Sequence, residues 1–455
     1  MNSHLRVPQS ADAMRRGTVQ GTRATDRTVT HSVERSSAQD RSEFATFDQR
    51  VPEIPAPAPQ RRFVSKRRGL SVGYVVDRFP RASHAFVLQE ILELQSLGIE
   101  VDVFSLDMPD GRIDDTAVAL ARLERPVRYF ISDEGATDDG DTVGEATAAE
   151  IRSRQARWLL NKVAARRIDH LHAHAAGSPT DVAREAARLA GVGFSFTARA
   201  NALDPDTDAL RQKIVDARFV VTPTDFDRGH LLRTCGADVA RKLHRIHVGI
   251  DPKEFRFSEP ACHDANSVLA TGPLVPKSGF ADLIEAIAIL RARGRIACLT
   301  IVGEGELEET LRAQIERSGL TECVQLVSGT SRDQLAMLMR MHTAMVVPWA
   351  GDGADHGVLP HVVLEAMAVG AVVLSTDVPG IRELIDDGMT GRVISPNDPV
   401  GLAGALETLF EFQDLRERMA SRARAKIEKR FTASRNVSQL AGLIMEAVVR
   451  KGLAT

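Results

Sequence analysis

The sequence has no long apolar run, few aromatic residues and only four cysteines, which are scattered. No stretch approaches the roughly 20 consecutive apolar residues that a membrane-spanning helix needs, so we expect no transmembrane segment. The first residues contain no apolar core segment, which argues against a secretory signal. The cysteines form no CxxC pair and have no histidine at ligand spacing, which favours reduced thiols over a disulfide or a structural metal. These absences predict a cytoplasmic protein and leave peripheral attachment to a membrane open.

The charge of the chain is nearly balanced, with a formal net charge of -3. A chain without a strong positive charge gives no reason to expect nucleic acid as a partner. Apolar residues make up 43% and charged residues 26%, which is ordinary for a globular protein. At 455 residues the chain is long enough for two domains with full cores.

Residues 1–66 differ from the rest because they are rich in Arg, Ser, Thr and Asp and poor in apolar residues. They include the proline-rich stretch VPEIPAPAPQ, and a segment of this composition cannot bury enough surface to offset its ordering entropy. We therefore expect these residues to be disordered. The following run RRFVSKRRG holds five basic residues. It is either a solvated charge run or a patch that contacts anionic lipid through Arg61–Arg68.

From Leu70 the pattern changes to apolar strands alternating with helices of 3.6-residue periodicity. One series runs from residue 70 to about residue 224, with Gly98 at the left-handed C-cap of its first helix. A second series starts near residue 267 and runs to about residue 412. Such alternation indicates parallel sheets covered on both faces, which is the α/β class. Two doubly wound domains that face each other would form a cleft at the carboxyl ends of their strands, where ligands of such sheets bind.

The stretch HGVLPHVVLEAMAVGAVVLSTDVPGI, residues 356–381, holds the main candidate site. Pro360 suits the first turn of a helix, so we expect a short helix over 361–369. Ala366 and Gly370 give this helix a slim face that lets a neighbouring element or a ligand approach closely. The free N–H groups of His361 to Val363 and the positive end of the helix dipole could bind a phosphate or diphosphate.

Glu365 lies one turn further into this helix, in an apolar segment. An ionised carboxylate at that depth needs hydrogen-bond donors, and the hydroxyls of a ribose would supply them. The alternative is a helix start capped by water, with Glu365 at the surface. The residues alone leave both interpretations open.

The order of these segments resembles family 4 glycosyltransferases, most closely the subgroup that makes exopolysaccharides such as colanic acid. The resemblance extends from Leu70 to about Lys451. The segments that carry it are SVGYVVDRFPRASHAFVLQEILELQSLGIEVDVFSL, HLHAHAA, SFTARANAL, IHVGIDPKEF, LIEAIAILRARG, LTIVGEGELEETL and LPHVVLEAMAVGAVVLSTDVPGIRELIDDGMTGRVISPND. The last segment is the most specific of them.

The resemblance implies the GT-B fold, with two facing Rossmann-like domains, and transfer of a sugar from a nucleotide-sugar donor with retention and without a metal. It implies an acceptor-side domain over residues 67–258 and a donor-binding domain over residues 259–425. A C-terminal helix, residues 426–455, would cross back to the first domain. The helix after Pro360 would hold the donor diphosphate through His361, Val363 and Leu364, and Glu365 would hold the ribose.

Four positions depart from the family pattern where chemistry is expected. The family acid eight residues before Glu365 corresponds to Gly357, or to His356 if one residue is inserted, and Asp355 is the nearest carboxylate. In GPLVPKSG, Pro273 stands for the family arginine, and Lys277 lies one place before the family lysine. A flexible ammonium can still reach a phosphate oxygen from there.

The other two departures lie in the first domain. Arg199 stands where the family commonly has a histidine near the reacting sugar, either as a cation that compensates for Pro273 or as a drifted residue. Ala202 stands where the family often has an aspartate. In the first loop Ser83 matches the family serine, while His84 replaces its acid. We therefore assign Arg199 and His356 to the sugar side, and Lys277 and Ser83 to donor binding.

Two patterns superficially suggest a metal. His170, His172 and His174 alternate along one strand and so face one side, but no acid or cysteine lies near them in the sequence at ligand spacing, which favours core or cleft-lining histidines. The acidic stretch GDGAD, residues 351–355, is interpreted as a loop.

Two functions remain in competition at this point. The first is a cytoplasmic, metal-independent glycosyltransferase that acts on a glycan or lipid-linked acceptor. The second is a catalytically degenerate relative that serves as a nucleotide-binding or scaffold subunit of a polysaccharide assembly machine. Loss of an arginine, a lysine and an acid together would remove several stabilising contacts from a transition state. The second function, without catalysis, therefore remains a candidate.

Overall fold

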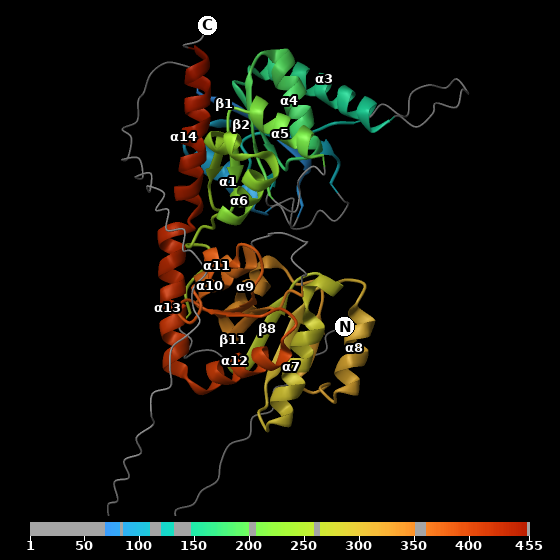
Figure 1. Ribbon diagram of the computed structural model, residues 1–455, viewed down its shortest axis with the longest axis vertical. Helices are drawn as coiled ribbons and strands as arrows, with labels where there is room; N and C mark the ends of the chain where they lie inside the picture. Colours follow the sequence, from blue (N-terminus) through green and yellow to red (C-terminus); the bar gives the residue numbers. More distant parts are fainter. Residues whose placement is uncertain are drawn as a thin grey trace, which may run out of the picture. The chain divides into compact units, whose positions relative to one another are not determined.

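Two parallel β-sheets with helices on their faces form the described part of the chain (Figure 1). The computed structural model describes residues 69–81, 85–109, 120–131, 147–199, 206–258, 264–350 and 361–452. The predicted disordered segment and the basic run Arg61–Arg68 lie outside these residues.

The first sheet has seven strands in the order β3-β2-β1-β4-β5-β6-β7, and each neighbouring pair is parallel. Its strands are β1 (Ser71–Arg78), β2 (Glu100–Asp107), β3 (Arg128–Tyr129), β4 (His170–His174), β5 (Gly193–Thr197), β6 (Val220–Thr222) and β7 (Leu243–Arg245). Its helices are α1 (Ala85–Ser96), α3 (Ala148–Arg166), α4 (Ser178–Ala190), α5 (Thr207–Asp216) and α6 (Asp225–Cys235), followed by the 3-10 helix η3 (Ala237–Lys242).

The second sheet has six parallel strands in the order β10-β9-β8-β11-β12-β13. Its strands are β8 (Asp264–Thr271), β9 (Cys298–Val302), β10 (Val324–Val327), β11 (His342–Val347), β12 (Val372–Thr376) and β13 (Arg392–Ile394). Its helices are η5 (Pro276–Ser278), α7 (Phe280–Ala292), α8 (Glu308–Arg317), α9 (Arg332–Met341), α10 (His361–Val369), α11 (Ile381–Leu384) and α12 (Pro399–Glu411).

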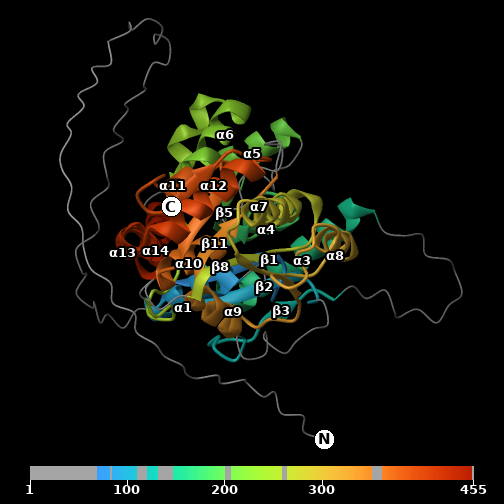
Figure 2. The ribbon, with the colours of Figure 1, turned by 90° about the horizontal axis from the view of Figure 1, so that it is seen from below.

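Both faces of each sheet are buried by helices. Successive strand residues point to opposite faces and so pack against different helices. In the second sheet, Val268 packs in the core with α7, α8 and α12, whereas the next residue, Leu269, packs with α9, α10 and α13. Figure 2 shows α7 and α9 on opposite sides of β8 and β11. In the first sheet, Val75 faces α3, α4 and α5, whereas Tyr74 faces α1 and α14. This double burial explains the nearly continuous apolar runs of the strands.

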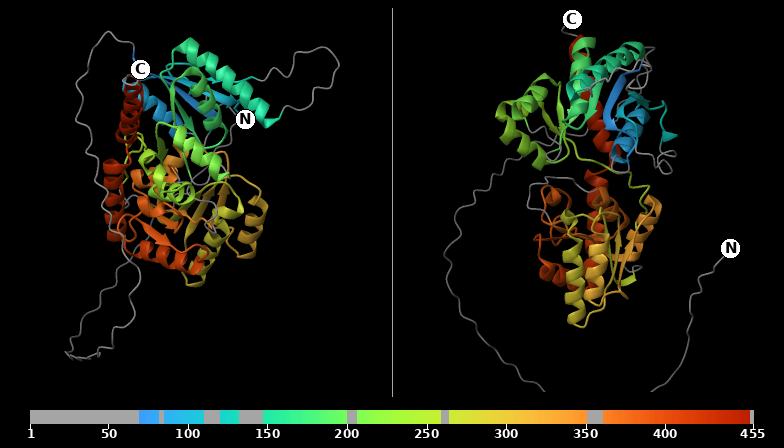
Figure 3. Two further views of the ribbon diagram at one scale, coloured as in Figure 1. Left: turned by 45° about the horizontal axis from the view of Figure 1, so that its top comes forward. Right: turned by 90° about the vertical axis from the view of Figure 1, so that its right-hand side faces the viewer.

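The last two helices, α13 (Gln413–Arg430) and α14 (Ala433–Gly452), pack on different sheets. Both are dark red in Figures 1 and 3. Ile427 of α13 lies in the core of the second sheet, and Ile444 of α14 lies in the core of the first. At the joint between the two helices, the N–H of Ile250 donates to the Phe431 carbonyl at 2.9 Å and the N–H of Ala433 donates to the Ile250 carbonyl at 2.8 Å. Ile250 lies in the segment between β7 and β8 that links the two sheets. This segment is therefore hydrogen-bonded to the joint between α13 and α14.

The predicted α/β class with two doubly wound sheets is confirmed. The helix expected over 361–369 has those bounds, and Gly98 has the expected positive φ of 82°. The short edge strands β3, β7 and β13 carry too few residues to show a period, and the sequence did not predict them. Among the described helices none is long and apolar enough to cross a membrane. Cys235, Cys298 and Cys323 are free thiols, and Cys262 lies outside the described residues.

Candidate functional site

The strand order of each sheet indicates where a ligand site is expected. In each sheet the order reverses at one point, between β1 and β4 in the first sheet and between β8 and β11 in the second. Ligands of open parallel sheets bind at the carboxyl ends of the strands at such a point. A ligand is therefore expected at the loops that follow β1, β4, β8 and β11.

Loops of the second sheet pack backbone against backbone. The N–H of Leu274 donates to the Glu304 carbonyl at 2.9 Å, and the Leu274 carbonyl accepts from the N–H of Leu307 at 3.0 Å. The Glu304 carboxylate in turn accepts from the N–H of Gly329 at 3.1 Å. These bonds join the loops after β8, β9 and β10 into one platform at the carboxyl edge.

Glycines make this platform feasible. A Cβ on Gly303 would lie 1.9 Å from the Gly272 carbonyl oxygen, and a Cβ on Gly305 would lie 2.6 Å from the Leu274 carbonyl oxygen. No side chain fits at either position without moving the backbone. The glycines of the VGEG segment are thus required by loop packing alone.

Lys277 lies in η5 at the end of β8, where its side chain is exposed. The turn is held by Ser278, whose hydroxyl donates to the Pro273 carbonyl at 2.6 Å. It is also held by Gly279, where a Cβ would lie 1.7 Å from the Pro348 carbonyl oxygen. Pro273 thus has a structural role in the turn through its carbonyl, and Lys277 carries an exposed side chain in the same turn.

Helix α10 is buried on most sides. Val363 and Leu364 belong to the apolar core of the second sheet, so only their backbone groups can contact a donor. A Cβ on Gly370 would lie 2.3 Å from the Ser258 carbonyl oxygen, and the N–H of Ser258 donates to the Val369 carbonyl at 2.8 Å. The slim face at the end of the helix therefore packs against a neighbouring segment rather than a ligand.

Glu365 is buried, with 8% of its surface exposed. Arg332 supplies its donors: Nε and Nη2 lie 3.3 and 3.0 Å from Oε1. The guanidinium also lies over the Phe255 ring, 5.2 Å from its centroid, and 3.7 Å from Glu254. The alternative interpretation, which placed Glu365 at the surface, is therefore wrong. The hydrogen-bond donors that a buried carboxylate needs are present. The donor found here is an arginine, whereas ribose binding remains a prediction.

Sequence reasoning missed Arg332. It occupies the first turn of α9, which Ser331 and Gln334 begin with a reciprocal capping box. The capping pattern predicts the helix start, but nothing in the sequence indicates that this side chain reaches a residue 33 positions later.

Along β4 of the first sheet, two histidines bond to hydroxyls of β5. His170 Nε2 and His172 Nδ1 each lie 2.8 Å from Ser195 Oγ, and His172 Nε2 lies 3.1 Å from Thr197 Oγ1. Burial lowers the pKa of both His170 and His172 to about 3, so both imidazoles are neutral at neutral pH.

Glu90 of α1 joins this group in three dimensions, although in the sequence no acid lies near the histidines at ligand spacing. Its Oε1 accepts from the Tyr74 hydroxyl at 2.6 Å and lies 2.8 Å from His174 Nε2. Burial raises the pKa of Glu90, but His174, His172 and the Tyr74 hydroxyl outweigh it and lower that pKa to about 2. Helical periodicity could have placed Glu90 on the face of Phe86, although not beside His174.

Glu90, His172 and His174 could together hold a metal, since their ligand atoms lie within 4.8 Å of one another. A carboxylate and two imidazoles are a suitable donor set for a transition metal. Both nitrogens of His172 already face hydroxyls, however, and Glu90 Oε1 already has two partners. The three side chains therefore fit a satisfied hydrogen-bond network better than a metal site.

Arg199 and His361 come from different sheets and contact the same ring. The Arg199 guanidinium carbon lies 4.2 Å from the Phe86 ring centroid, and the His361 ring stacks on Phe86 with centroids 4.9 Å apart and 25° between planes. Burial and the nearby cations Arg199 and Arg332 lower the pKa of His361 to about 3. Arg199 and His361 thus form, with Phe86, a contact between the two halves of the site.

Two predicted site residues, Ser83 and His356, lie outside the described residues, as do Asp355, Gly357 and Pro360. The structure brings together His361, Glu365 and Arg199, with Phe86 and Arg332 added. Lys277 lies on the platform at the end of β8.

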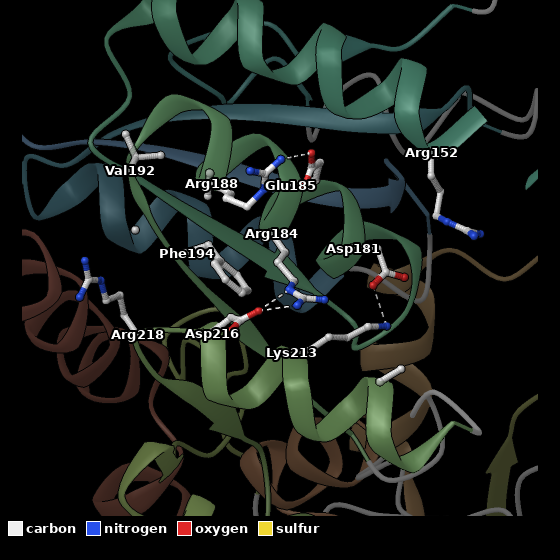
Figure 4. Close-up of a pocket in the computed structure, with 13 residues that line it drawn as sticks. Arg152, Asp181, Arg184, Glu185, Arg188, Val192, Phe194, Lys213, Asp216 and Arg218 are labelled. Carbon is white, nitrogen blue, oxygen red and sulfur yellow. Dashed lines mark hydrogen bonds and ion pairs between the residues drawn. The ribbon is translucent and has the colours of Figure 1, made fainter. Parts of the chain in front are cut away.

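A cavity of about 910 Å³ lies elsewhere, between α4 and α5 of the first sheet (Figure 4). Three ion pairs line it: Lys213–Asp181 at 2.9 Å, Arg184–Asp216 at 2.5 Å and Arg188–Glu185 at 2.7 Å. Arg152 and Arg218 stand at opposite sides of the view. The lining includes the ends of helices and the start of β5. The start of a strand lies at the amino edge of the sheet, whereas the predicted site lies at the carboxyl edge, so this cavity is separate from the predicted site.

Part of the chain is similar to a known protein family. Residues 251–426 match the family model of glycosyl transferases group 1, and this range contains Lys277, Arg332 and Glu365. The amylovoran biosynthesis glycosyltransferase AmsK of Erwinia amylovora is 31% identical over 208 residues, which cover 45% of this chain and 51% of the relative. The alignment thus spans about half the length of that relative.

Other similarities extend over most of the chain. WcaL of Salmonella typhimurium, named for colanic acid biosynthesis, is 25% identical over 414 residues, covering 82% of this chain and 99% of the relative. The crystal structure of Anabaena HepE in complex with UDP has a TM-score of 0.67 and 17% identity, covering 83% of this chain and 100% of that one. A likeness at that identity shows the fold. Residues 251–426 are thus similar to the group 1 glycosyl transferases, and the two parallel sheets of the chain have the GT-B fold predicted from the sequence.

Proposed function

We propose that the protein transfers a sugar, with retention, from a nucleotide-sugar donor to a glycan or lipid-linked acceptor in exopolysaccharide or cell-surface glycan synthesis. Support comes from relatives that are named for amylovoran and colanic acid biosynthesis and from a neighbour of the same fold that binds UDP.

The observation that carries this proposal is the buried carboxylate of Glu365 inside the region that matches the family. A buried carboxylate needs donors, and Arg332, with 49% of its side chain exposed, provides them from one side only. The ribose hydroxyls of the donor would join or replace Arg332 at Glu365. The diphosphate would then lie at the first amides of α10, one turn away, where the helix dipole favours negative charge.

The departing nucleoside diphosphate gains negative charge as the sugar leaves, and preorganised donors must stabilise it. We propose that the amides of α10 and the ammonium of Lys277 do this without a metal. Arg199 and His356 are the proposed sugar-side groups. A chelator should therefore leave the rate of donor hydrolysis unchanged, and a loss of rate restored by a divalent cation would contradict the metal-independent part of the proposal.

Nucleotide binding and turnover can be tested separately. Purified protein is titrated with UDP, GDP and their glucose conjugates by calorimetry, and slow donor hydrolysis is followed in parallel. Glu365→Gln should weaken nucleotide binding about tenfold or more, since hydrogen bonds to a charged group contribute about 1.5–3 kcal/mol. The matched control is Glu308→Gln, which also removes a carboxylate paired to an arginine, at 2.7 Å, but on the exposed helix α8.

Equal affinities of the wild type and Glu365→Gln would refute the assignment of Glu365. Binding without hydrolysis, and without transfer to membrane extracts, would instead favour the scaffold function.

We also propose that a lipid-linked acceptor is reached at an anionic membrane surface through the basic residues Arg61–Arg68. Each basic residue near such a surface contributes about 1 kcal/mol, and salt weakens the attraction. Co-sedimentation with vesicles that contain phosphatidylserine should exceed that with neutral vesicles and fall when Arg61, Arg62, Lys66, Arg67 and Arg68 are changed to Gln. Equal sedimentation with both vesicle types would exclude this contact.

A further inference from the structure

Arg199 has a buried donor without an acceptor. Its Nη2 is shielded from solvent and has no hydrogen-bond partner, and the same is true of His361 Nε2. Both residues contact Phe86, Arg199 at 4.2 Å from the ring centroid and His361 at 4.9 Å. Two side chains that contact one aromatic ring, with Arg199 near enough to affect the pKa of His361, thus each carry an unsatisfied buried nitrogen, although buried polar atoms are usually hydrogen-bonded.

The acids near Arg199 are already engaged with other groups. Glu90 bonds to the Tyr74 hydroxyl and to His174. Asp227 accepts from the Thr224 hydroxyl at 2.6 Å. Both carboxylates lie near enough to favour the guanidinium cation, while burial lowers the pKa of Arg199. Within the described residues no carboxylate is recorded in an ion pair with Arg199, so an anion from outside the chain is the partner that its charge would favour.

The shape of these two groups restricts the ligand. A guanidinium presents a planar fork that matches two oxygens of a carboxylate or a phosphate. His361 is neutral at neutral pH because burial lowers its pKa to about 3, and a neutral imidazole can donate one N–H to the same anion. His361 also begins α10, one turn before Glu365. An anion between Arg199 and His361 would therefore belong to the part of the donor beyond its ribose.

We propose that Arg199 and His361, held against Phe86, form a subsite for an anionic oxygen of the donor. The oxygen belongs either to the diphosphate or to a carboxylate on the transferred sugar, as in a nucleotide-linked uronic acid. This inference rests on the proposed function, because it places the subsite beside the nucleotide. It makes Arg199 a specificity-determining residue and explains how one cation could compensate for Pro273.

The test compares the wild type with Arg199→Met and Arg199→Lys in calorimetric titrations. The probes are UDP, GDP, the glucose and glucuronate conjugates of UDP, and inorganic pyrophosphate. Arg199→Met should weaken binding of the anion-bearing probes about tenfold or more, because it removes a charge-assisted hydrogen bond. Arg199→Lys should restore part of the loss. Arg218→Met, a change of an exposed arginine beside the first sheet, is the matched control and should bind every probe as the wild type does.

The pattern across probes identifies the source of the anion. An equal loss for UDP, pyrophosphate and both sugar conjugates assigns the oxygen to the diphosphate. A loss confined to UDP-glucuronate assigns it to a sugar carboxylate.

Thermal unfolding without ligand separates a binding role from a structural one. Arg199→Met removes a buried, incompletely satisfied cation, so its Tm should equal or exceed that of the wild type, and its rise on adding ligand should be smaller. A large fall in Tm together with an unchanged ligand-induced rise would indicate a structural role and overturn the subsite.

The remaining outcomes distinguish this inference from the proposed function. If Arg199→Met binds every probe as the wild type does, the subsite is refuted while nucleotide binding stands. If the wild type binds pyrophosphate through Arg199 but no nucleotide, the subsite stands and the proposed function fails. If the wild type binds none of the probes, both are refuted.

Discussion

The carboxyl ends of the two sheets are built in different ways. At the first sheet, ionisable and hydroxyl side chains fill the space, with Glu90 bonded to Tyr74 and His174, and His172 bonded to Ser195. At the second sheet the space is filled by backbone, because Gly272, Gly303 and Gly305 let the loops touch.

This difference indicates different tasks. A surface of backbone amides and glycines can bind a group that all donors share, such as a diphosphate, without discriminating among sugars. A network of side chains can change from one relative to the next without loss of the fold, and it can therefore select an acceptor or a sugar. Arg199 and Phe86 belong to the side-chain surface of the first sheet, while His361 and Glu365 stand at the edge of the backbone surface of the second sheet.

The largest effect is expected where backbone meets backbone. Gly279 has a φ of 68°, and an added Cβ would lie 1.7 Å from the Pro348 carbonyl oxygen. Gly279→Ala should lower the free energy of unfolding by about 3 kcal/mol or more, because it combines a clash with a strained φ. Denaturant unfolding measures this change.

The matched control is Gly404→Ala in α12, where a Cβ would meet nothing within 4 Å. That variant should be as stable as the wild type or gain up to about 1 kcal/mol, since alanine favours the helix. Similar stabilities for the two variants would contradict the tight packing of the loops at the carboxyl edge of the second sheet.

A smaller effect is expected in the first region, where side chains carry the bonds. Glu90→Gln should cost about 1–3 kcal/mol at neutral pH, because it removes the charge that accepts from Tyr74 and pairs with His174. The pKa of Glu90 is lowered from 4.5 to about 2, so its contribution is complete above pH 4.5 and is lost as the pH falls from about 4.5 to about 2.

Denaturant unfolding at pH 6, 4.5 and 3 measures this dependence. The difference between the wild type and Glu90→Gln should shrink from pH 4.5 to pH 3. A difference that stays constant over that range would mean that folding does not lower the pKa of Glu90.

The smallest effect on stability is expected at Arg332, even though it contacts the key carboxylate. Its side chain is 49% exposed, so Arg332→Gln should change the free energy of unfolding by less than about 1 kcal/mol. The same variant should bind UDP or GDP a few-fold more tightly, because the ribose no longer competes with the guanidinium for Glu365. Calorimetry measures both affinities, and weaker binding would mean that Arg332 itself contacts the nucleotide.

Local patterns predicted the regular parts of this molecule well. The proline and the apolar spacing around residues 361–369 were sufficient for α10, and glycine at position 98 was sufficient for a left-handed cap. Edge strands such as β3 and β13 were missed, since two or three residues show no periodicity. The role of Gly370 was predicted as close approach, but its partner, residues 257–258, could not be read from sequence.

The candidate site was predicted in the same uneven way. Glu365 stood out because a carboxylate in an apolar helix needs an explanation. Arg332 and Glu90 did not stand out in the sequence, because a charged residue at the start of a helix or on its face is common. Their partners lie 33 and 84 residues away in the chain.

By itself, the sequence determined the α/β class, the two series of strands and the helix that carries Glu365, because these depend on local periodicity, capping and burial. Only the tertiary structure decided that Arg332 bonds Glu365, that Glu90 completes the histidine network and that Arg199 and His361 share Phe86. The physical reason is that such contacts form where strand order brings distant loops to one edge, and no local pattern encodes that order.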